Sequence, residues 1–302
     1  MTAKLGVVAL CLIGLHFSLD CRAYAADAAD QAVIARGAVL FAAAGCANCH
    51  TDRPHKGPRL GGGRALVTAF GTFYTPNISP DPQFGIGRWS DTDFLNALHQ
   101  GVSPSGKDYY PAFPYAAFTQ MSDDDILAIK RYIFSLPPQR VVNRPHALHF
   151  PFNIRLGIKL WKILYLREGP LAPDPDESAA WNRGAYLVRA VVHCGECHTP
   201  RNFLGALEDG RRFAGNATGP DGMTAPDITP DPKALGRWST DDIASFLDDG
   251  FTPSGDSTGN TMAEVIHGTG MLSPADRQAI AVYLKTQIPI SPEPGTEIRP
   301  GG

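Results

Sequence analysis

Three features that mark other classes of protein are scarce or missing in this sequence. Its 27 lysines and arginines are outnumbered by 30 aspartates and glutamates, and no basic stripe typical of nucleic-acid binding is present. No segment after residue 17 is apolar over the roughly 20 residues that a membrane-spanning helix needs. Strand signals are almost absent. The apolar residues, 43% of a chain of 302, are enough to fill two modest cores. We therefore expect a globular, helical protein without a nucleic-acid partner.

The first 25 residues have the pattern of an export signal. Lys4 precedes an apolar run over residues 5–17, and Ala23-Tyr24-Ala25 offers a small-x-small cleavage site. We expect cleavage after Ala25 and a periplasmic location. Cleavage would also remove Cys11 and Cys21, so the mature chain would hold cysteine only within one repeated pattern.

That pattern is C-x-x-C-H, which occurs at residues 46–50 and again at 194–198. It is the attachment signature of haem c, in which two thiols bond one porphyrin and the following imidazole binds the iron. We expect two covalently bound haem c groups, attached through Cys46, Cys49, Cys194 and Cys197, with His50 and His198 as metal ligands.

Two other uses of a C-x-x-C pair must be weighed. One is a disulfide or dithiol redox pair, and the other is a zinc site made from both pairs. Zinc ribbons usually space their pairs by about 15 to 20 residues, whereas these begin 148 positions apart, at 46 and 194. Haem attachment is the stronger interpretation.

The chain repeats itself at nearly the same offset. Residues 74–82 (Tyr-Thr-Pro-Asn-Ile-Ser-Pro-Asp-Pro) return at 224–232, and the Gly-Arg-Trp-Ser of 87–90 returns at 236–239. We predict a tandem duplication, with a first domain over residues 26–139, a proline-rich linker over 140–176 and a second domain over 177–302.

Each repeat has the signals of three helices. A periodic apolar segment runs into the haem pattern, over residues 32–44 and 181–192. A second helix begins at a serine that has an aspartate three residues on. A third helix begins at another serine, and in the second repeat its first helical residue is Pro274. These starts are Ser90, Ser239, Ser122 and Ser273. We predict an all-α fold of two tandem class I-like cytochrome c domains.

The linker contains an insert over residues 155–167 that has no counterpart elsewhere in the chain. Its basic residues and Trp161 suit an interfacial amphipathic helix that touches a membrane or a partner. The interpretation that we favour is a linker helix laid across both domains.

With these motifs in place, the chain resembles the dihaem c-type cytochromes related to the cytochrome subunits of periplasmic alcohol, aldehyde and gluconate dehydrogenases. The resemblance rests on both C-x-x-C-H motifs, on the repeats above, on the Tyr-Pro-Ala-Phe-Pro-Tyr of residues 110–115 and on the Met-Ala-Glu-Val of 262–265. It implies a protein that accepts electrons from a partner dehydrogenase and passes them to a downstream cytochrome or oxidase. Residues 57–60 resemble the loop that orients the iron-binding histidine through a backbone carbonyl.

The same resemblance places Met262 as the sixth iron ligand of the second domain, with Met271 and Met223 as poorer candidates. The equivalent residue of the first domain is Phe113, which has no lone pair to donate. We favour Met121 as the ligand there, although its counterpart in the second domain is Leu272. Two alternatives stay open: a histidine, or an iron with no sixth protein ligand. The histidines on offer are His55, His99, His146 and His149.

The state of the first iron separates the possible functions. A haem with both axial positions filled suits electron transfer, which is the leading hypothesis. An open first haem would favour a peroxidase-like haem enzyme. A haem-bearing sensor or scaffold module is a third possibility.

Overall fold

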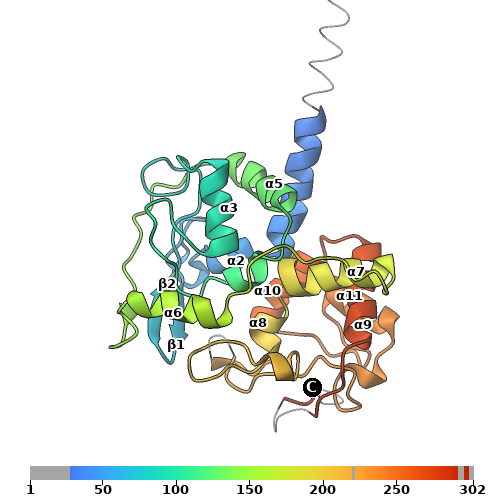
Figure 1. Cartoon of the computed structure of the whole chain (residues 1–302). Coiled ribbons are helices and arrows are strands. Elements are labelled where there is room, and N and C mark those ends of the chain that lie inside the picture. Colours follow the sequence, from blue (N-terminus) through green and yellow to red (C-terminus); the bar gives the residue numbers. More distant parts are fainter. Residues whose placement is uncertain (1–27, 220–221, 292–295, 299–302) are drawn as a thin grey trace, which may run out of the picture.

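The computed structural model describes residues 28–219, 222–291 and 296–298, whose arrangement Figure 1 shows. The expected export signal, residues 1–25, lies outside the described residues. Helices dominate the described chain, as predicted. Residues 28–139 are called the first half below, and the described residues from 177 to 298 the second half. In Figure 1 the first half occupies the upper left and the second half the lower right.

The first half opens with a helix over residues 28–43, which leads into the first C-x-x-C-H motif. This helix crosses α5 (Asp123–Phe134) at Gly37, where a Cβ atom would lie 1.9 Å from the carbonyl oxygen of Ala128. Only glycine lets the two backbones come so close. The remaining helical elements are α2 (Cys46–Cys49), the 3-10 turn η1 (Arg53–His55), α3 (Asp91–Gln100) and α4 (Tyr115–Phe118).

The second half repeats this plan. Helix α7 (Ala179–Tyr186) continues as the π-helix η2 (Leu187–Val191) and crosses α11 (Pro274–Lys285) at Gly184. A Cβ atom there would lie 2.0 Å from the carbonyl oxygen of Ala279, so the same close crossing occurs in both halves. The other helical elements are α8 (Gly195–His198), η3 (Asp209–Arg211), η5 (Leu235–Arg237), α9 (Thr240–Asp249) and α10 (Asn260–Thr269).

The predicted helix starts are confirmed. The side chain of Ser90 accepts a hydrogen bond from the amide of Asp93, and the Asp93 carboxylate accepts one from the amide of Ser90, at 3.1 and 2.9 Å. Ser239 and Asp242 form the same capping box at the start of α9. These serines satisfy amides that the first helical turn leaves without partners. Ser122 and Ser273 cap α5 and α11 in the same way.

The all-α prediction needs one correction, because a small antiparallel sheet is present. Strand β1 (Ala65–Thr68) and strand β2 (Gly71–Tyr74) form a hairpin, and β3 (Ala147–Leu148) from the linker pairs with β2. The hairpin sequence, Ala-Leu-Val-Thr followed by Gly-Thr-Phe-Tyr, is rich in the β-branched and aromatic residues that strands favour. Its strands are only four residues long, which is too short to give a clear alternating pattern in the sequence.

Helix α6 (Leu156–Tyr165) forms from the linker insert and touches both halves. Lys162 donates hydrogen bonds to the Gly101 carbonyl (2.9 Å) and to Asp108 (2.6 Å) in the first half. The indole nitrogen of Trp161 donates to the Leu204 carbonyl in the second half, at 3.1 Å. These contacts are those expected of a linker helix laid across both halves.

The two halves also meet directly along their first and last helices. In each half an arginine of the first helix pairs with an aspartate of the last, Arg36 with Asp125 and Arg183 with Asp276. The hydroxyl of Tyr186 in α7 donates to Asp125 at 2.5 Å and so joins the second half to the first. Among the described residues, no helix is long and apolar enough to cross a membrane.

Candidate haem attachment sites

The four cysteines of the C-x-x-C-H motifs sit on or beside the short helices α2 and α8. All four are described, and no disulfide joins any of them. Burial, together with the smaller effect of the neighbouring Cys49, raises the pKa of Cys46 to about 12. Burial acts on Cys194 in the same way, to about 12, with Cys197 beside it. A dithiol redox pair needs a lowered thiol pKa, so this environment argues against that use.

A shared zinc site is also not formed. Within residues 28–219, 222–291 and 296–298, no group of three or more histidine, cysteine, aspartate or glutamate side chains is arranged to hold a metal ion. Zinc would need four such ligands around one point. The two pairs instead stand on separate elements, as independent attachment sites would.

The histidines of the two motifs are held in matching ways. Nδ1 of His50 lies 2.7 Å from the carbonyl oxygen of Pro76, and Nδ1 of His198 lies 2.7 Å from that of Pro226. A carbonyl can only accept, so Nδ1 carries the proton and Nε2 keeps its lone pair. Burial lowers the pKa of both imidazoles, and the hydrogen bond to the carbonyl only partly opposes this. Both rings are thus neutral, oriented and ready to bind a metal through Nε2.

The source of these carbonyls differs from the sequence expectation. The carbonyl of Pro58 accepts from the amide of Gly61 and closes a simple turn, so residues 57–60 do not orient His50. The carbonyl comes instead from the repeated stretches at 74–82 and 224–232. The repeat was visible in the sequence, but nothing in it showed that two prolines 150 positions apart, at 76 and 226, share one task.

In each half, one glycine brings the proline loop close to the histidine. Gly62 has a φ of 73° and donates its amide to the carbonyl of His50, and Gly215, with a φ of 84°, does the same for His198. A Cβ atom on Gly62 would lie 2.4 Å from the carbonyl carbon of Pro76. A side chain at this position would push the accepting carbonyl away from the histidine.

The segments expected to supply sixth ligands are less alike. Met262 is half-buried in the first turn of α10, at the edge of the core. Phe113 precedes α4, and its ring contacts Tyr109, Tyr115 and Phe118 with centroids 5.9, 6.3 and 5.8 Å away. An aromatic cluster therefore occupies the region where the second half carries a thioether.

Comparison with known proteins identifies the family of the chain. The sequence model of the family described as Cytochrome c matches residues 34–137. A protein named diheme cytochrome c-type from Cereibacter sphaeroides is 45% identical over 83% of this chain and 84% of its own length. The chain belongs to the c-type cytochromes.

Two further relatives of this cytochrome are subunits of dehydrogenases. It is 37% identical to the fructose dehydrogenase cytochrome subunit of Gluconobacter japonicus, over 89% of this chain and 55% of the relative. It is 34% identical to the gluconate 2-dehydrogenase cytochrome c subunit of Pantoea cypripedii, over 93% of this chain and 64% of the relative. The chain thus spans between half and two thirds of the length of these subunits.

The residues of the cytochrome fit covalent haem c. Each motif offers two thiols on one short turn and a neutral imidazole whose Nδ1 is already committed. In c-type cytochromes such a histidine binds the iron, and methionine as the opposite ligand raises the reduction potential.

Met121, the expected sixth ligand of the first half, is fully buried, with 0% of its surface exposed. Its amide donates to the carbonyl of Phe118, just as that of Leu272 donates to the carbonyl of Thr269. Leu272 is likewise buried, at 3% exposed. Met121 therefore stays a prediction, but it lies where the second half places a packing residue.

Three of the four histidines weighed as alternative ligands are engaged elsewhere or face solvent. Nδ1 of His55 lies 2.9 Å from Asp52. His99 is the exception, because its buried Nε2 has no hydrogen-bond partner among the described residues and lies 3.7 Å from Asp123. His146 accepts a hydrogen bond from the amide of Tyr74 in β2, and His149 is exposed. A histidine that the sequence argument did not weigh is His193, which is half-buried beside Phe118 and has Nε2 3.3 Å from the Ala44 carbonyl.

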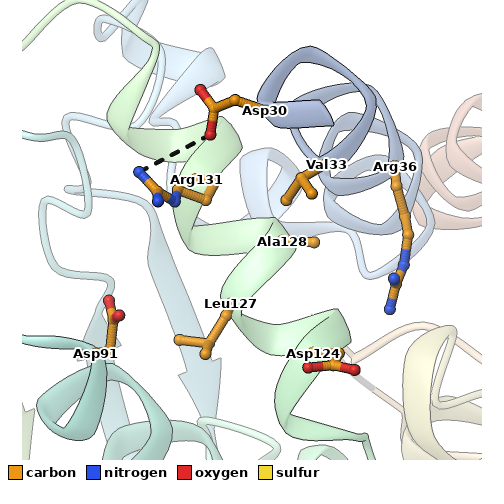
Figure 2. A pocket seen from close by; sticks show the side chains of 8 residues that line it. All are labelled: Asp30, Val33, Arg36, Asp91, Asp124, Leu127, Ala128 and Arg131. Atoms are coloured by element: carbon orange, nitrogen blue, oxygen red, sulfur yellow. Dashed lines mark ion pairs between the residues drawn. The ribbon is translucent and has the colours of Figure 1, made fainter. Parts of the chain in front are cut away.

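A surface groove between the helix over 28–43 and α5 is unrelated to these sites. Figure 2 shows its lining, in which Arg131 approaches Asp30 at 4.0 Å. The lining includes charged side chains of both signs but no cysteine, histidine or methionine. It therefore offers no ligand for a haem iron.

Proposed function

We propose that the protein is a periplasmic electron-transfer cytochrome that carries two covalently bound haem c groups. Haem 1 is attached at Cys46 and Cys49, and haem 2 at Cys194 and Cys197. The observation that carries the proposal is the matched pair of hydrogen bonds from His50 to Pro76 and from His198 to Pro226, both 2.7 Å long. One such bond can be incidental, whereas two at equivalent positions indicate two equivalent sites.

The proposal includes two tandem cytochrome c domains, over residues 26–139 and 177–302, joined by the linker 140–176. Its support is the repetition of packing as well as sequence: the glycine crossings at Gly37 and Gly184 and the paired capping boxes recur in both halves. Each domain is a small set of helices whose core the porphyrin would complete.

In this function the residues of the chain hold each haem and shield it from water. When bound, haem c supplies an iron that takes up and releases one electron. His50 and His198 present Nε2 to that iron, and the proline carbonyls fix the imidazole rings. Met262 is the proposed sixth ligand of haem 2, where a thioether favours the reduced iron and raises the potential. The buried surroundings exclude water and keep charge reorganisation small.

A dehydrogenase is the proposed electron donor, with a downstream cytochrome or oxidase of the respiratory chain as acceptor. The support is the resemblance to subunits that are named for fructose and gluconate dehydrogenases. Export through the signal at residues 1–25 would bring the cytochrome to the periplasm, where its donor would also lie.

A second candidate function, a peroxidase-like haem enzyme, is favoured by the surroundings of Phe113. If Met121 only packs, as Leu272 does, haem 1 keeps an open sixth position to which peroxide or another small ligand can bind. If Met121 is the ligand, as we predicted from the sequence, both haems are closed and electron transfer alone remains.

The deciding experiment uses holoprotein made with a haem c maturation system. Electron paramagnetic resonance of the oxidised protein and carbon monoxide addition to the reduced protein report the state of each haem. Two low-spin signals without carbon monoxide binding support electron transfer. One high-spin haem that binds carbon monoxide would overturn the Met121 assignment and favour the enzyme.

Met121→Leu is the matched variant for this test, because it copies Leu272 and nearly conserves volume, at a cost below about 1.5 kcal/mol. If Met121 is a ligand, the variant converts one haem to a high-spin form. If Met121 only packs, the spectra stay unchanged.

We also propose that the outer face of α6 lies against an anionic membrane surface. Leu156, Leu160 and Ile163 line this face and are 73%, 60% and 75% exposed, although they are apolar. Lys159 and Arg167 are exposed beside them. An apolar stripe next to cationic side chains suits a helix at a lipid interface with anionic head groups.

Sedimentation with vesicles tests this contact. The cytochrome should bind vesicles that contain phosphatidylglycerol and should bind phosphatidylcholine vesicles less. Leu160→Asn with Ile163→Asn should abolish binding, whereas Ile288→Asn, at another apolar residue that is 80% exposed, should not. Equal binding by all three proteins, or no binding at all, would overturn the membrane contact. Loss of dehydrogenase coupling in the double variant would then indicate a protein partner.

A further inference from the structure

The sixth-ligand segment of each half lies against the attachment motif of the other half. Helix α10, which carries Met262, touches Asn48 within the first motif: the side-chain amide of Asn48 donates to the Glu264 carbonyl at 3.1 Å. In the opposite direction, α4 packs against η2, and the Phe118 ring lies 5.3 Å from that of His193, the residue before the second motif. The contact is therefore reciprocal.

The α10 side of this contact is held by charges. The Glu264 carboxylate accepts hydrogen bonds from Arg53 at 3.1 Å and from Arg64 at 2.9 Å, both in the first half. Arg64 also donates to the backbone carbonyl of Asn48 at 2.6 Å, and Arg53 donates to the Asn48 side chain at 3.2 Å. Glu264 is two residues from Met262, and Asn48 lies between the two cysteines of the first motif.

This cluster is shielded enough to matter energetically. The side chains of Arg64 and Glu264 are 16% and 21% exposed. Ion pairs at such burial are screened less than surface pairs, and removal of the Glu264 charge takes the shared carboxylate from both arginines. The backbone confirms the close approach, since a Cβ atom on Gly268 of α10 would lie 2.2 Å from the carbonyl oxygen of Ala42.

Where α4 packs against η2, no ion pair between the halves occurs among the described residues. Tyr115 takes the position equivalent to Glu264, and Glu196 that equivalent to Asn48. Glu196 pairs within its own half, with Arg201 at 2.6 Å. The buried Tyr115 hydroxyl has no hydrogen-bond partner among the described residues. Of these two contacts, only the one at α10 therefore has ion pairs between the halves among the described residues, and both involve Glu264.

We propose that Glu264, held by Arg53, Arg64 and Asn48, is a positioning residue that fixes the Met262 segment of the second site against the attachment motif of the first. A change at one haem site is then transmitted to the other, and the two haems do not behave as independent centres. The inference rests on the proposed function, since it requires haem at both motifs.

The test crosses the boundary between the halves and uses the full-length holoprotein. Arg64→Gln, a change in the first half, should weaken the near-infrared absorption band of the methionine-ligated haem 2. Glu264→Gln, a change in the second half, should alter the low-temperature spectrum of haem 1 and shift its midpoint in a potentiometric titration. Glu177→Gln removes one exposed carboxylate outside this cluster and should leave both haems unchanged.

Hydrogen exchange supplies a readout that does not depend on haem spectra. In both bridge variants the amides of residues 46–50 and of 260–269 should exchange about tenfold faster together. The proposal is overturned if each variant affects only the haem and the amides of its own half. Should the second motif carry no haem, a haem assay would give one per chain, and this failure of the proposed function would be seen separately from the cross effects on exchange.

Discussion

The two C-x-x-C-H sites are alike around the histidine and differ at the proposed sixth ligand. Both histidines give Nδ1 to a proline carbonyl at 2.7 Å, and a glycine with positive φ brings each proline loop into place. At the proposed sixth ligand, one half has the half-buried Met262, whereas the other has Phe113 at the equivalent position and a buried Met121. The arrangement that holds the histidine is shared, whereas the residues at the proposed sixth ligand differ, and under the proposed function this difference can give the two haems different potentials or different ligands.

Exchanging the residues at the sixth position should have the largest effect on this comparison. Met262→Phe copies the first site, so haem 2 should lose its methionine absorption band, become high spin, bind carbon monoxide and fall in potential. Phe113→Met copies the second site and should add a methionine band for haem 1 and raise its potential. Absorption spectra, electron paramagnetic resonance and redox titration measure each change.

Met271→Phe is the control for this exchange, since Met271 is 46% exposed and lies at the start of the last helix. It should leave haem 2 unchanged. A methionine band that survives Met262→Phe would contradict the assignment and move it to Met271 or Met223.

A smaller effect, on stability, is expected where the two proline loops differ by an amide and a carboxylate, at Asn77 and Asp227. Asn77 donates to the carbonyls of Gln139 and Val141, at 2.7 and 3.1 Å. Asp227 takes the equivalent place, and one of its buried carboxylate oxygens has no partner among the described residues. Burial raises the pKa of Asp227, so folding favours its protonated form.

Asp227 makes the stability of the protein fall as pH rises. Above the usual carboxyl pKa, the unfolded chain loses the Asp227 proton first, and the folded protein loses stability. Asp227→Asn should therefore stabilise the protein by about 1 kcal/mol near neutral pH and by little in acid. Asn77→Asp should destabilise it by roughly 1–3 kcal/mol at neutral pH, because two donated hydrogen bonds are lost. Denaturant unfolding at both pH values measures this, and equal stability of all three proteins would contradict it.

The smallest expected effects come from the feature that the halves share most closely. Ser90→Ala and Ser239→Ala each remove a capping box and should each cost about 1 kcal/mol. Thermal unfolding followed by circular dichroism should give similar decreases in Tm if the halves unfold together. A decrease for one variant alone would show that one half unfolds first. Ser90→Thr and Ser239→Thr keep the capping hydroxyl and serve as controls.

Much of the fold was readable from the sequence because its signals are local. A serine with an aspartate three residues on, ahead of a periodic apolar segment, is a local capping signal, so the starts of α3 and α9 were predicted correctly. The sheet was missed because β3 is two residues long and comes from the linker, more than 70 positions after β2. Pairing at such a distance depends on how the chain packs and leaves no periodic trace.

The sequence by itself determined the two haem-attachment motifs and the internal repeat. Two thiols and an imidazole in C-x-x-C-H act within five adjacent residues, and a repeat is visible as letters. Only the tertiary structure decided which carbonyls orient His50 and His198, that Met121 is buried as Leu272 is, and that Glu264 joins α10 to the first motif. These features depend on backbone atoms and on residues as many as 216 positions apart, which come together only when the chain folds.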